Sequence, residues 1–411
     1  MDFAPSPEAA EIAARVEAFF AEEVLPRNAE WRAHDGPGDP PFLAGLRAKA
    51  REAGLWNLGL TSLPEGAPGR PLPNLAFAGA AEIMGRLPWG SIVFNAHAPD
   101  LPNMITLRDA GTEEQKARWL MPLLRGETRS AFAMTEPAVG SSDARNIALR
   151  AERIAGGWRL TGRKWFASGA SHPDCAFIIV VGATGEPGGR GAHSAFIVPT
   201  RTPGMEVVRE LRFLGYAEKP TPGAEITFDG VEIGEDALLG REGGGFEVAQ
   251  TRLGPARVHH AMRSIGLAEV LIDLMKARAA ERKTFGRALA EYDTVQGWIA
   301  RSRVEVEQAR LLVLRAAWKL DLRGHAAAWG DVSAVKVALP AMLQGISDRA
   351  VQLFGAMGGT DDTPIHAAYA WARAFRIFDG PDEVHLRQIF RQEPPAPWSV
   401  AESPYITAGR R

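Results

Sequence analysis

The segment Ala131-Phe-Ala-Met-Thr-Glu-Pro-Ala-Val-Gly-Ser-Ser-Asp143 marks a change from helical to strand-like patterning along the chain. It places three hydroxyl groups, those of Thr135, Ser141 and Ser142, around a tight turn that contains Pro and Gly. Hydroxyls and backbone N–H groups in such a turn can hydrogen-bond the carbonyl groups of a heterocycle. The sequence therefore predicts a ligand-binding turn at the entry to a β region.

Helical patterning lies on both sides of this β region. Upstream helices are expected at 12–24, 42–53, 74–86 and 111–127, where apolar residues recur at helical spacing. Short strands are expected at 157–161, 176–181, 195–198 and 225–233. Downstream, 304–322 and 332–354 are apolar on more than one face, which favours burial in a bundle, and Pro340 is expected to kink the second or start a new helix.

Composition narrows the class of protein. The chain has 411 residues, of which 46% are hydrophobic, enough for a large core and two or three domains. A net charge of −2 gives no reason to expect a nucleic-acid partner. The single cysteine, Cys175, excludes a disulfide within the chain. No apolar run is expected to span a membrane, and the acidic start, residues 1–11, lacks an export or organelle signal, so a cytoplasmic location is expected.

A second informative run, Phe375-Arg-Ile-Phe-Asp-Gly-Pro-Asp-Glu-Val-His385, lies near the C-terminal end. Its first acid, Asp379, lies between Phe378 and Gly380, where a carboxylate can be desolvated and closely approached by a substrate. Those conditions suit a general base. An acid before Gly-Pro is more often a solvated turn, so the assignment depends on the rest of the chain.

Nucleotide and metal motifs are scarce. No Gly-x-Gly-x-x-Gly follows a predicted strand, so a dinucleotide would need another mode of binding. The run Gly243-Gly-Gly245 lacks the Lys-Ser/Thr of a phosphate loop and is expected to be a flexible hinge. Neither His-Glu-x-x-His nor a cysteine cluster occurs, and no metal is expected.

The segment Gly162-Arg-Lys-Trp-Phe-Ala-Ser-Gly169 follows the first run. Together they resemble the acyl-CoA dehydrogenase signature, aromatic-x-x-Thr-Glu-Pro-x-x-Gly-Ser-Asp and then Gly-x-Lys-x-aromatic-x-Thr/Ser. Further blocks that are similar to this family occur in the same order at 111–116, 281–286, 350–355 and 379–385. The resemblance implies an α+β, acyl-CoA dehydrogenase-like fold: an N-terminal α-helical domain (1–129), a middle β-barrel-like domain (130–240), a C-terminal four-helix bundle (241–395) and a tail (396–411).

The resemblance also implies a set of site residues. Within one subunit, FAD would be bound by Phe132, Met134, Thr135, Ser141, Phe166 and Ser168, with Thr135 on the pyrimidine edge. From the neighbouring subunit it would be reached by Arg282, Thr284, Phe285, Gln352 and Gly355, with Arg282 on the pyrophosphate. Acyl-CoA would be contacted by Ser141, Arg257, Phe378 and Gly380. Glu383 would lie on the flavin ribose or on the surface.

The reaction implied by the resemblance is α,β-desaturation of an acyl-CoA thioester. Asp379 would remove the α-proton while the β-hydride passes to flavin N5, and electrons would leave for an electron-transferring flavoprotein. The backbone N–H of Asp379 would hydrogen-bond the thioester oxygen. A homodimer or homotetramer is implied, without nucleic acid or membrane insertion.

Some positions depart from the family pattern. The Gly-Ser-Ser-Asp run is one residue longer than usual, so either Ser141 or Ser142 could face the flavin. Phe166 replaces the usual tryptophan. The usual base is Glu, and Asp379 is one methylene shorter, roughly 1.5 Å of reach. Asp382 and Glu383 stay open as alternative bases.

The runs at 253–260 and 379–385 are similar to the branch of the family that in animals is fused to a kinase-like domain. His259 and His260, in the first run, either pack between helices or contact substrate. Two other functions stay open: a nitroalkane oxidase, which also uses an Asp here but passes electrons to oxygen, and a flavin-bearing DNA-binding relative, which the near-neutral charge disfavours.

Overall fold

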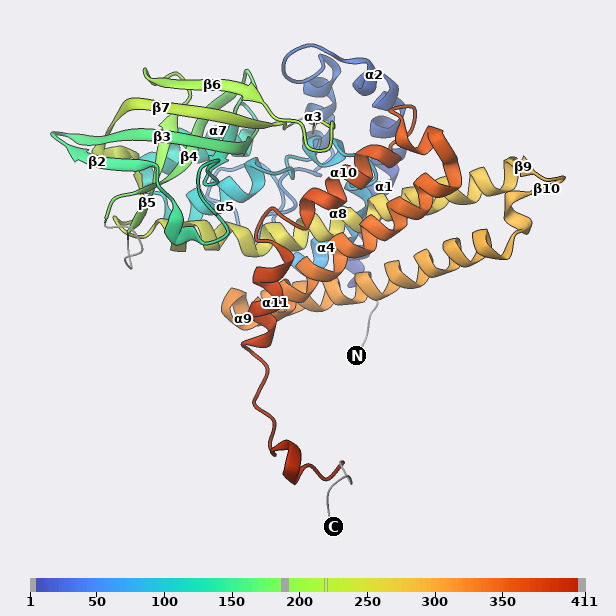
Figure 1. Ribbon diagram of the computed structural model, residues 1–411. Coiled ribbons are helices and arrows are strands. Elements are labelled where there is room, and N and C mark those ends of the chain that lie inside the picture. The colour runs from blue at the N-terminus through green and yellow to red at the C-terminus, as the bar shows by residue number, and fades with distance from the viewer. Residues whose placement is uncertain (1–4, 186–191, 218, 220, 406–411) are drawn as a thin grey trace.

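The computed structural model describes residues 5–185, 192–217, 219 and 221–405. The expected order of a helical part, a β part and a helical bundle is confirmed: the β part lies beside one end of the long C-terminal helices, and the N-terminal helices pack against the same helices (Figure 1). Residues 1–4 of the acidic start, and the tail beyond 405, lie outside the described residues.

The N-terminal part is helical. Its helices are α1 (Pro7–Phe19), α2 (Asn28–Ala33), α3 (Phe42–Glu52), α4 (Asn74–Met84), α5 (Asp100–Ala110), α6 (Glu113–Gln115) and α7 (Met121–Arg125). Two helix ends in this part carry clear sequence signals. Gly54 follows α3 with a φ of 66°, and Thr112 caps α6 in a reciprocal capping box with Gln115.

The middle part is one mixed sheet. Its strands are β1 (Arg129–Ala133), β2 (Arg150–Ile154), β3 (Gly157–Ser168), β4 (Cys175–Ala183), β5 (His193–Pro199), β6 (Met205–Glu210), β7 (Gly223–Gly234) and β8 (Leu238–Leu239). They pair in the order β6-β7-β3-β2-β4-β5-β8, and β1 joins β4 in parallel. Trp158, Phe196 and Phe228 are buried in a core of this part alone, so the sheet is a unit that can hold loops rigidly.

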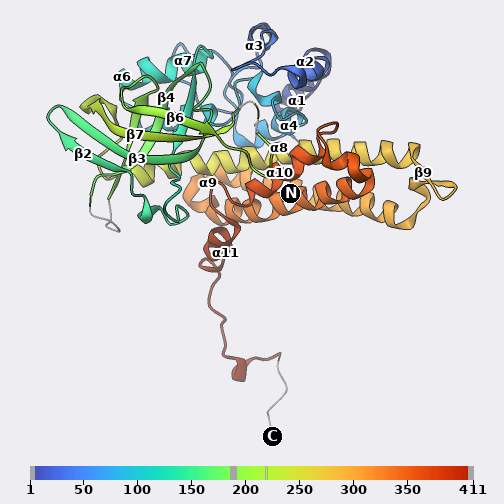
Figure 2. The ribbon, with the colours of Figure 1, turned by 45° about the horizontal axis from the view of Figure 1, so that its top comes forward.

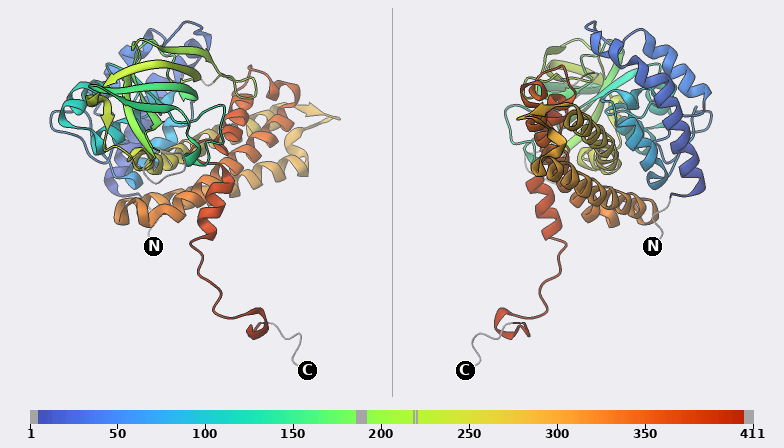
Figure 3. Two further views of the ribbon diagram at one scale, coloured as in Figure 1. Left: turned by 60° about the vertical axis from the view of Figure 1, so that its left-hand side comes forward. Right: turned by 90° about the vertical axis from the view of Figure 1, so that its right-hand side faces the viewer.

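The C-terminal part consists of α8 (Gly245–Glu281), α9 (Asp293–Phe354), α10 (Ile365–Phe375) and α11 (Asp382–Phe390). The short strands β9 (Lys283–Thr284) and β10 (Arg287–Ala288) form a hairpin at the far tip between α8 and α9 (Figure 2). The break in α9 lies at Gly324, where φ is 73°, and Pro340 stays inside the second half. The segment after α11 extends away from the domains (Figure 3).

The glycine run at 243–245 differs from the expectation drawn from the sequence. At Gly245 a Cβ would meet the Ser194 backbone at 2.7 Å, and the Gly243 N–H donates to Ser194 Oγ at 2.9 Å. The glycine run therefore packs closely on β5 where a flexible hinge was expected.

The segment 293–359 is long and apolar enough, by length and composition alone, to cross a membrane. Of its most apolar window 56% is buried inside the protein, and a core helix passes the same test.

Candidate active site

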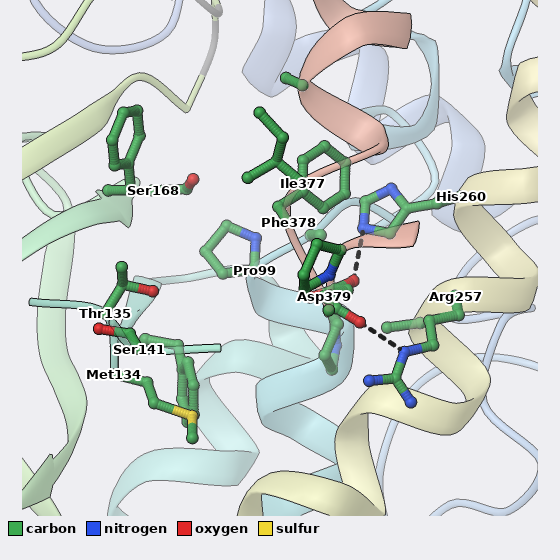
Figure 4. Close-up of a pocket in the computed structure, with 18 of the residues that line it drawn as sticks. Pro99, Met134, Thr135, Ser141, Ser168, Arg257, His260, Ile377, Phe378 and Asp379 are labelled. Carbon is green, nitrogen blue, oxygen red and sulfur yellow. Dashed lines mark hydrogen bonds and ion pairs between the residues drawn. The ribbon is translucent and has the colours of Figure 1, made fainter. Parts of the chain in front are cut away.

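A cavity of about 1690 Å³ lies where the three parts meet. One wall comes from the end of β1, the turn after it and β3, and the opposite wall comes from α8 and the α10–α11 turn (Figure 4). Many residues predicted from the sequence line it: Phe132, Met134, Thr135, Ser141, Phe166, Ser168, Arg257, Phe378, Asp379 and Gly380. Ser142 lines it too. The fold thus brings segments about 240 residues apart in the chain to one site.

A buried ion pair fixes the β wall. Lys164 on β3 is fully buried and donates to Glu136 Oε1 at 2.7 Å and to the Met134 carbonyl at 2.8 Å. The Glu136 carboxylate also accepts from the backbone N–H groups of Ala148 and Leu149, both at 2.8 Å. Burial lowers the pKa of Lys164 to about 8, and the Glu136 charge opposes that shift. The pair holds the turn that carries Thr135 against β3.

Phe166 reaches the cavity through an irregularity in β3. The β3–β7 register shifts between Lys164 and Ala167, and Phe166 adopts a φ of 51°. A Cβ on Gly223 of β7 would lie 3.2 Å from the Phe166 ring, so the glycine leaves room for this conformation. Bulges commonly re-aim a side chain beside an active site, and this one turns an aromatic ring, 45% exposed, toward the cavity.

Ser141 closes the turn after β1. Its hydroxyl accepts a hydrogen bond from the Glu136 N–H at 2.9 Å and lies 3.4 Å from the Glu136 carbonyl. Ser142 is exposed. Both serines line the cavity, so the extra residue in this run places two hydroxyls there.

The opposite wall holds Asp379 in a left-handed conformation, with a φ of 56°, followed by Gly380 with a φ of 96°. The Asp379 main-chain carbonyl accepts from Arg257 Nε at 2.9 Å and from His385 Nε2 at 3.1 Å. Burial lowers the pKa of His385 to about 4 and also lowers that of Arg257. These contacts fix the backbone of Asp379 and leave its carboxylate, 19% exposed, facing the cavity.

A second buried lysine lies beneath this turn. Lys336 of α9 donates to the carbonyls of Phe375 and Gly380, the latter at 3.1 Å. Its Nζ also lies 4.8 Å from the centre of the Phe375 ring and 5.7 Å from that of Phe378. Burial lowers the pKa of Lys336 to about 8, against the nearby Asp379 charge.

The acids of the 379–385 run lie in different environments. Asp379 lines the cavity. Asp382 is buried, and its Oδ2 accepts from Arg376 Nε at 2.7 Å. Glu383 is exposed and lies outside the cavity lining. Among these acids, Asp379 has the carboxylate that a bound ligand can reach most directly.

Behind Asp379 lies a polar cluster formed by His260, Arg263, His97 and Ser91. Arg263 donates through one nitrogen to His260 Nδ1 at 2.7 Å and through the other to His97 Nδ1 and Ser91 Oγ, both at 2.9 Å. Burial lowers the pKa of both histidines well below the usual value, and the Arg263 charge adds to the shift. Both imidazoles and the guanidinium line the cavity.

Six predicted site residues lie away from the cavity lining: Arg282, Thr284, Phe285, Gln352, Gly355 and Glu383. The first three lie at or beside the hairpin at the α8–α9 tip, where Phe285 is fully exposed with a φ of 49°. Gln352 and Gly355 are exposed at the end of α9. The predicted ligand of the first five lies in a neighbouring subunit, and Glu383 is exposed.

Several residues that shape the cavity carry no sequence-based prediction: Glu136, Lys164, Lys336, His385, His97 and Arg263. A charged residue in a segment otherwise apolar on several faces was the available signal for Lys336. The signal for the Glu136–Lys164 pair was weaker: each lies in one of the two signature segments, 131–143 and 162–169, but nothing local indicates that they meet.

Comparison with known proteins places the chain in a family. Residues 6–127, 131–231 and 243–393 match the acyl-CoA dehydrogenase N-terminal, middle and C-terminal domains. The "Probable acyl-CoA dehydrogenase FadE2" of Mycobacterium tuberculosis is 44% identical over 404 residues, 96% of this chain and 97% of that protein. A solved structure of "a putative acyl-CoA dehydrogenase from Mycobacterium abscessus" superposes with a TM-score of 0.90 at 44% identity, covering 95% of this chain and 98% of that chain.

A mouse relative differs in length. Acyl-CoA dehydrogenase family member 10 of Mus musculus is 43% identical over 91% of this chain, but the match covers only 36% of that protein. The chain thus spans about a third of that relative and nearly all of the mycobacterial one. Because three domain matches and a relative aligned over almost its full length agree, the chain belongs to the acyl-CoA dehydrogenase family and is an FAD-dependent oxidoreductase.

Proposed function

We propose that this enzyme desaturates an acyl-CoA thioester between Cα and Cβ, with Asp379 as the base that removes the α-proton. The observation that carries the proposal is the environment of Asp379. Its main-chain carbonyl is held by Arg257 and His385, whereas its carboxylate faces the cavity opposite Thr135 and Ser168. Among the described residues, no Lys or Arg forms an ion pair with this carboxylate, so it can accept a proton from a ligand without first breaking one.

The residues of the cavity fit FAD. A volume of about 1690 Å³ exceeds the roughly 300–1,000 Å³ of an ordinary small-molecule pocket, so a cofactor and a substrate can share it. Thr135 and Ser168 offer hydroxyls, Phe132 and Met134 line the same cavity, and the Phe166 ring offers a stacking surface. We propose that these residues, with Ser141 or Ser142, hold FAD on the β wall.

FAD supplies an acceptor, at its N5 atom, for the hydride that leaves Cβ. Residues of the chain remove the proton, bind the thioester and exclude water. Asp379 accepts the α-proton, and its backbone N–H donates to the thioester oxygen so that the α-carbon becomes more acidic. Phe378 and Gly380 border the acyl chain and exclude water. Arg257 fixes the Asp379 carbonyl and lines the substrate side of the cavity.

The left-handed turn offers a reason for the shorter base. An Asp reaches roughly 1.5 Å less far than the usual Glu. A positive φ is uncommon for a residue with a side chain such as Asp379, and buried donors hold the carbonyls of Asp379 and Gly380. We propose that this turn brings the backbone toward the substrate. Asp382 is a weaker candidate because it pairs with Arg376, and Glu383 because it is exposed.

We further propose a shared cofactor site in a homodimer or homotetramer. Arg282, Thr284, Phe285, Gln352 and Gly355 would reach FAD in the partner subunit, and Glu383 would lie near its ribose. The full exposure of Phe285 supports this assignment, because an aromatic side chain at the tip of a hairpin is seldom left in water. The domain divisions at 130, 241 and 396, and electron transfer to an electron-transferring flavoprotein, belong to the same proposal.

The branch of the family is also a proposal. The blocks Leu-Gly-Pro-Ala-Arg-Val-His-His (253–260) and Asp-Gly-Pro-Asp-Glu-Val-His (379–385) suggest the branch fused to a kinase-like domain in animals. Similarity to acyl-CoA dehydrogenase family members 10 and 11, which are two to three times longer than the matched region, supports that placement.

An anaerobic bleaching screen tests the function. Holoenzyme is mixed without oxygen with butyryl-, octanoyl-, palmitoyl-, isobutyryl- and 4-hydroxyoctanoyl-CoA, and with nitroethane as the competing substrate class. Rapid loss of flavin absorbance with at least one thioester is expected. Reduction by nitroethane alone, with peroxide formed on admitting oxygen, would replace the proposal with a nitroalkane oxidase.

A further inference from the structure

We infer that His260 is a positioning residue for the Asp379 carboxylate and presents a neutral Nε2–H group to it. The inference rests on the proposed role of Asp379 as the base. His260 Nε2 lies 4.0 Å from Asp379 Oδ2, and the His260 ring points toward the Asp379 carboxylate (Figure 4). In this inference, His260 does more than pack between helices, because it positions the proposed base.

The tautomer of His260 follows from its other neighbour. Arg263 donates to His260 Nδ1 at 2.7 Å, and a guanidinium has no acceptor atom. Nδ1 must therefore carry its lone pair, which leaves the ring proton of the neutral imidazole on Nε2. That proton points to the side where Asp379 lies.

The surroundings favour the neutral ring. The charged and titratable groups that face His260 are Arg263, His97, His259 and Lys336, along with Asp379 itself. Protonation would put a hydrogen on Nδ1, directly against the Arg263 donor, and burial also opposes it. The ring is further enclosed by Phe375 and Phe378, at 5.7 and 5.5 Å between ring centres.

A neutral donor suits a base better than a cation would. A carboxylate can rotate about its side-chain bonds, and only one oxygen should meet the α-proton. Holding Oδ2 with an N–H group would leave Oδ1 for the substrate, and it would reduce basicity less than an ion pair does. The distance of 4.0 Å exceeds that of a hydrogen bond, but catalytic contacts often tighten only when substrate binds.

Two amide variants separate the donor from general packing. The amide nitrogen of His260→Gln can take the place of Nε2, whereas the shorter amide of His260→Asn reaches only the place of Nδ1. We expect His260→Asn to slow anaerobic flavin reduction by about 10²-fold, the usual effect of a misplaced group, and His260→Gln to recover most of that loss. The measurement uses saturating levels of the fastest thioester of the screen, with FAD content and thermal midpoint as controls for folding.

The α-deuterium isotope effect is the readout that a packing role would not change. Misplacing the base makes proton removal more rate-limiting, so the effect on flavin reduction should rise in His260→Asn and return toward the wild-type value in His260→Gln. Equal rates and isotope effects in all three proteins, or equal losses in both variants, would overturn the inference.

A double variant separates failure of this inference from failure of the proposed function. If His260 acts through Asp379, His260→Asn should cost nothing further in an Asp379→Asn background. Additive losses would contradict positioning, while an active Asp379→Asn enzyme would instead refute the base assignment. If the His260 variants do not fold, ¹⁵N spectra of the labelled wild-type holoenzyme still test the tautomer. Because His385 also carries its ring proton on Nε2, the His260 ring is assigned through its contacts with Phe375 and Phe378, and an Nδ1–H form of that ring near neutral pH would rule the inference out.

Discussion

The two walls of the cavity each hold a residue in a left-handed conformation, but with different contacts. Each presents one residue in a left-handed conformation, Phe166 on the β wall and Asp379 on the helical wall, with φ values of 51° and 56°. Each is also supported by a buried lysine. Lys164 pairs with the Glu136 carboxylate at 2.7 Å, whereas Lys336 donates to two main-chain carbonyls and lies against aromatic rings.

The difference matches what each wall must do. A binding surface can be fixed by a complete ion pair, because nothing on it needs to change protonation. A wall that carries a base cannot place a cation directly on that carboxylate without lowering its basicity. Among the described residues, no carboxylate forms an ion pair with Lys336, which instead holds the Asp379 turn through carbonyl groups. On the helical wall, Lys336 thus holds the backbone of the turn, and the Asp379 carboxylate stays free of a cation for its proposed role as the base.

The largest effect is expected from a substitution of Asp379, the proposed base on the helical wall. Asp379→Asn keeps size and shape but removes the base, so flavin reduction by acyl-CoA should fall about 10²–10⁴-fold while FAD stays bound. Stopped-flow absorbance without oxygen measures the rate. Glu393→Gln, at an exposed acid outside the cavity lining, is the matched control and should remain close to wild type. Glu383→Gln tests the alternative base: a loss of rate in that variant with retention in Asp379→Asn would move the base to Glu383.

On the β wall, a substitution in the buried ion pair should lower the stability of the protein. Glu136→Gln leaves the fully buried Lys164 without its counter-charge, which typically costs about 3–5 kcal/mol. We expect a lower unfolding midpoint and release of FAD. Adding Lys164→Met removes the stranded charge and should restore part of the loss. A single variant as stable as wild type would show that the ion pair does not fix this wall.

Sequence reasoning gave the order of the three parts and the motifs that meet at the cavity. It worked where a signal is local. Thr112 and Gly54 are helix-end signals, and the alternation in 225–233 lies inside β7. It missed α5 because every position of that helix from Asp100 to Leu107 is buried, which leaves no amphipathic pattern to detect.

Parts of the site were beyond local reasoning for a similar reason. The Glu136–Lys164 pair depends on β1 ending beside β3, and the Lys336 contacts depend on α9 passing beneath a turn about 40 residues later. No spacing rule relates such residues. The break in α9 at Gly324 lies between the helices expected at 304–322 and 332–354, and only a residue without a side chain adopts its φ of 73° readily. Pro340, expected to kink the second helix or start a new one, lies inside it.

A smaller effect is expected from the lysine of the helical wall. Lys336→Met removes the buried charge together with its desolvation cost, so no charge is stranded, but the carbonyls of Phe375 and Gly380 lose a donor. An unsatisfied buried acceptor costs about 1–3 kcal/mol. We expect a lower unfolding midpoint than wild type, by less than in Glu136→Gln, and slower flavin reduction because the Asp379 turn loosens. A loss of stability equal to that of Glu136→Gln would erase the proposed difference between the walls.

The smallest expected effect is acid sensitivity of the helical wall. His385 is buried there, and its folded-state pKa of about 4 lies below the roughly 6.5 of an unfolded histidine. Between these values the unfolded chain binds a proton that the folded chain does not, so stability is complete above pH 6.5 and falls as the pH drops toward 4. At pH 5 the loss from this residue is about 2 kcal/mol. His385→Gln keeps an amide that can donate to the Asp379 carbonyl but cannot titrate, so its unfolding midpoint should drop less than that of wild type between pH 7 and pH 5. An identical drop in both proteins would mean that His385 does not carry the acid sensitivity of the helical wall.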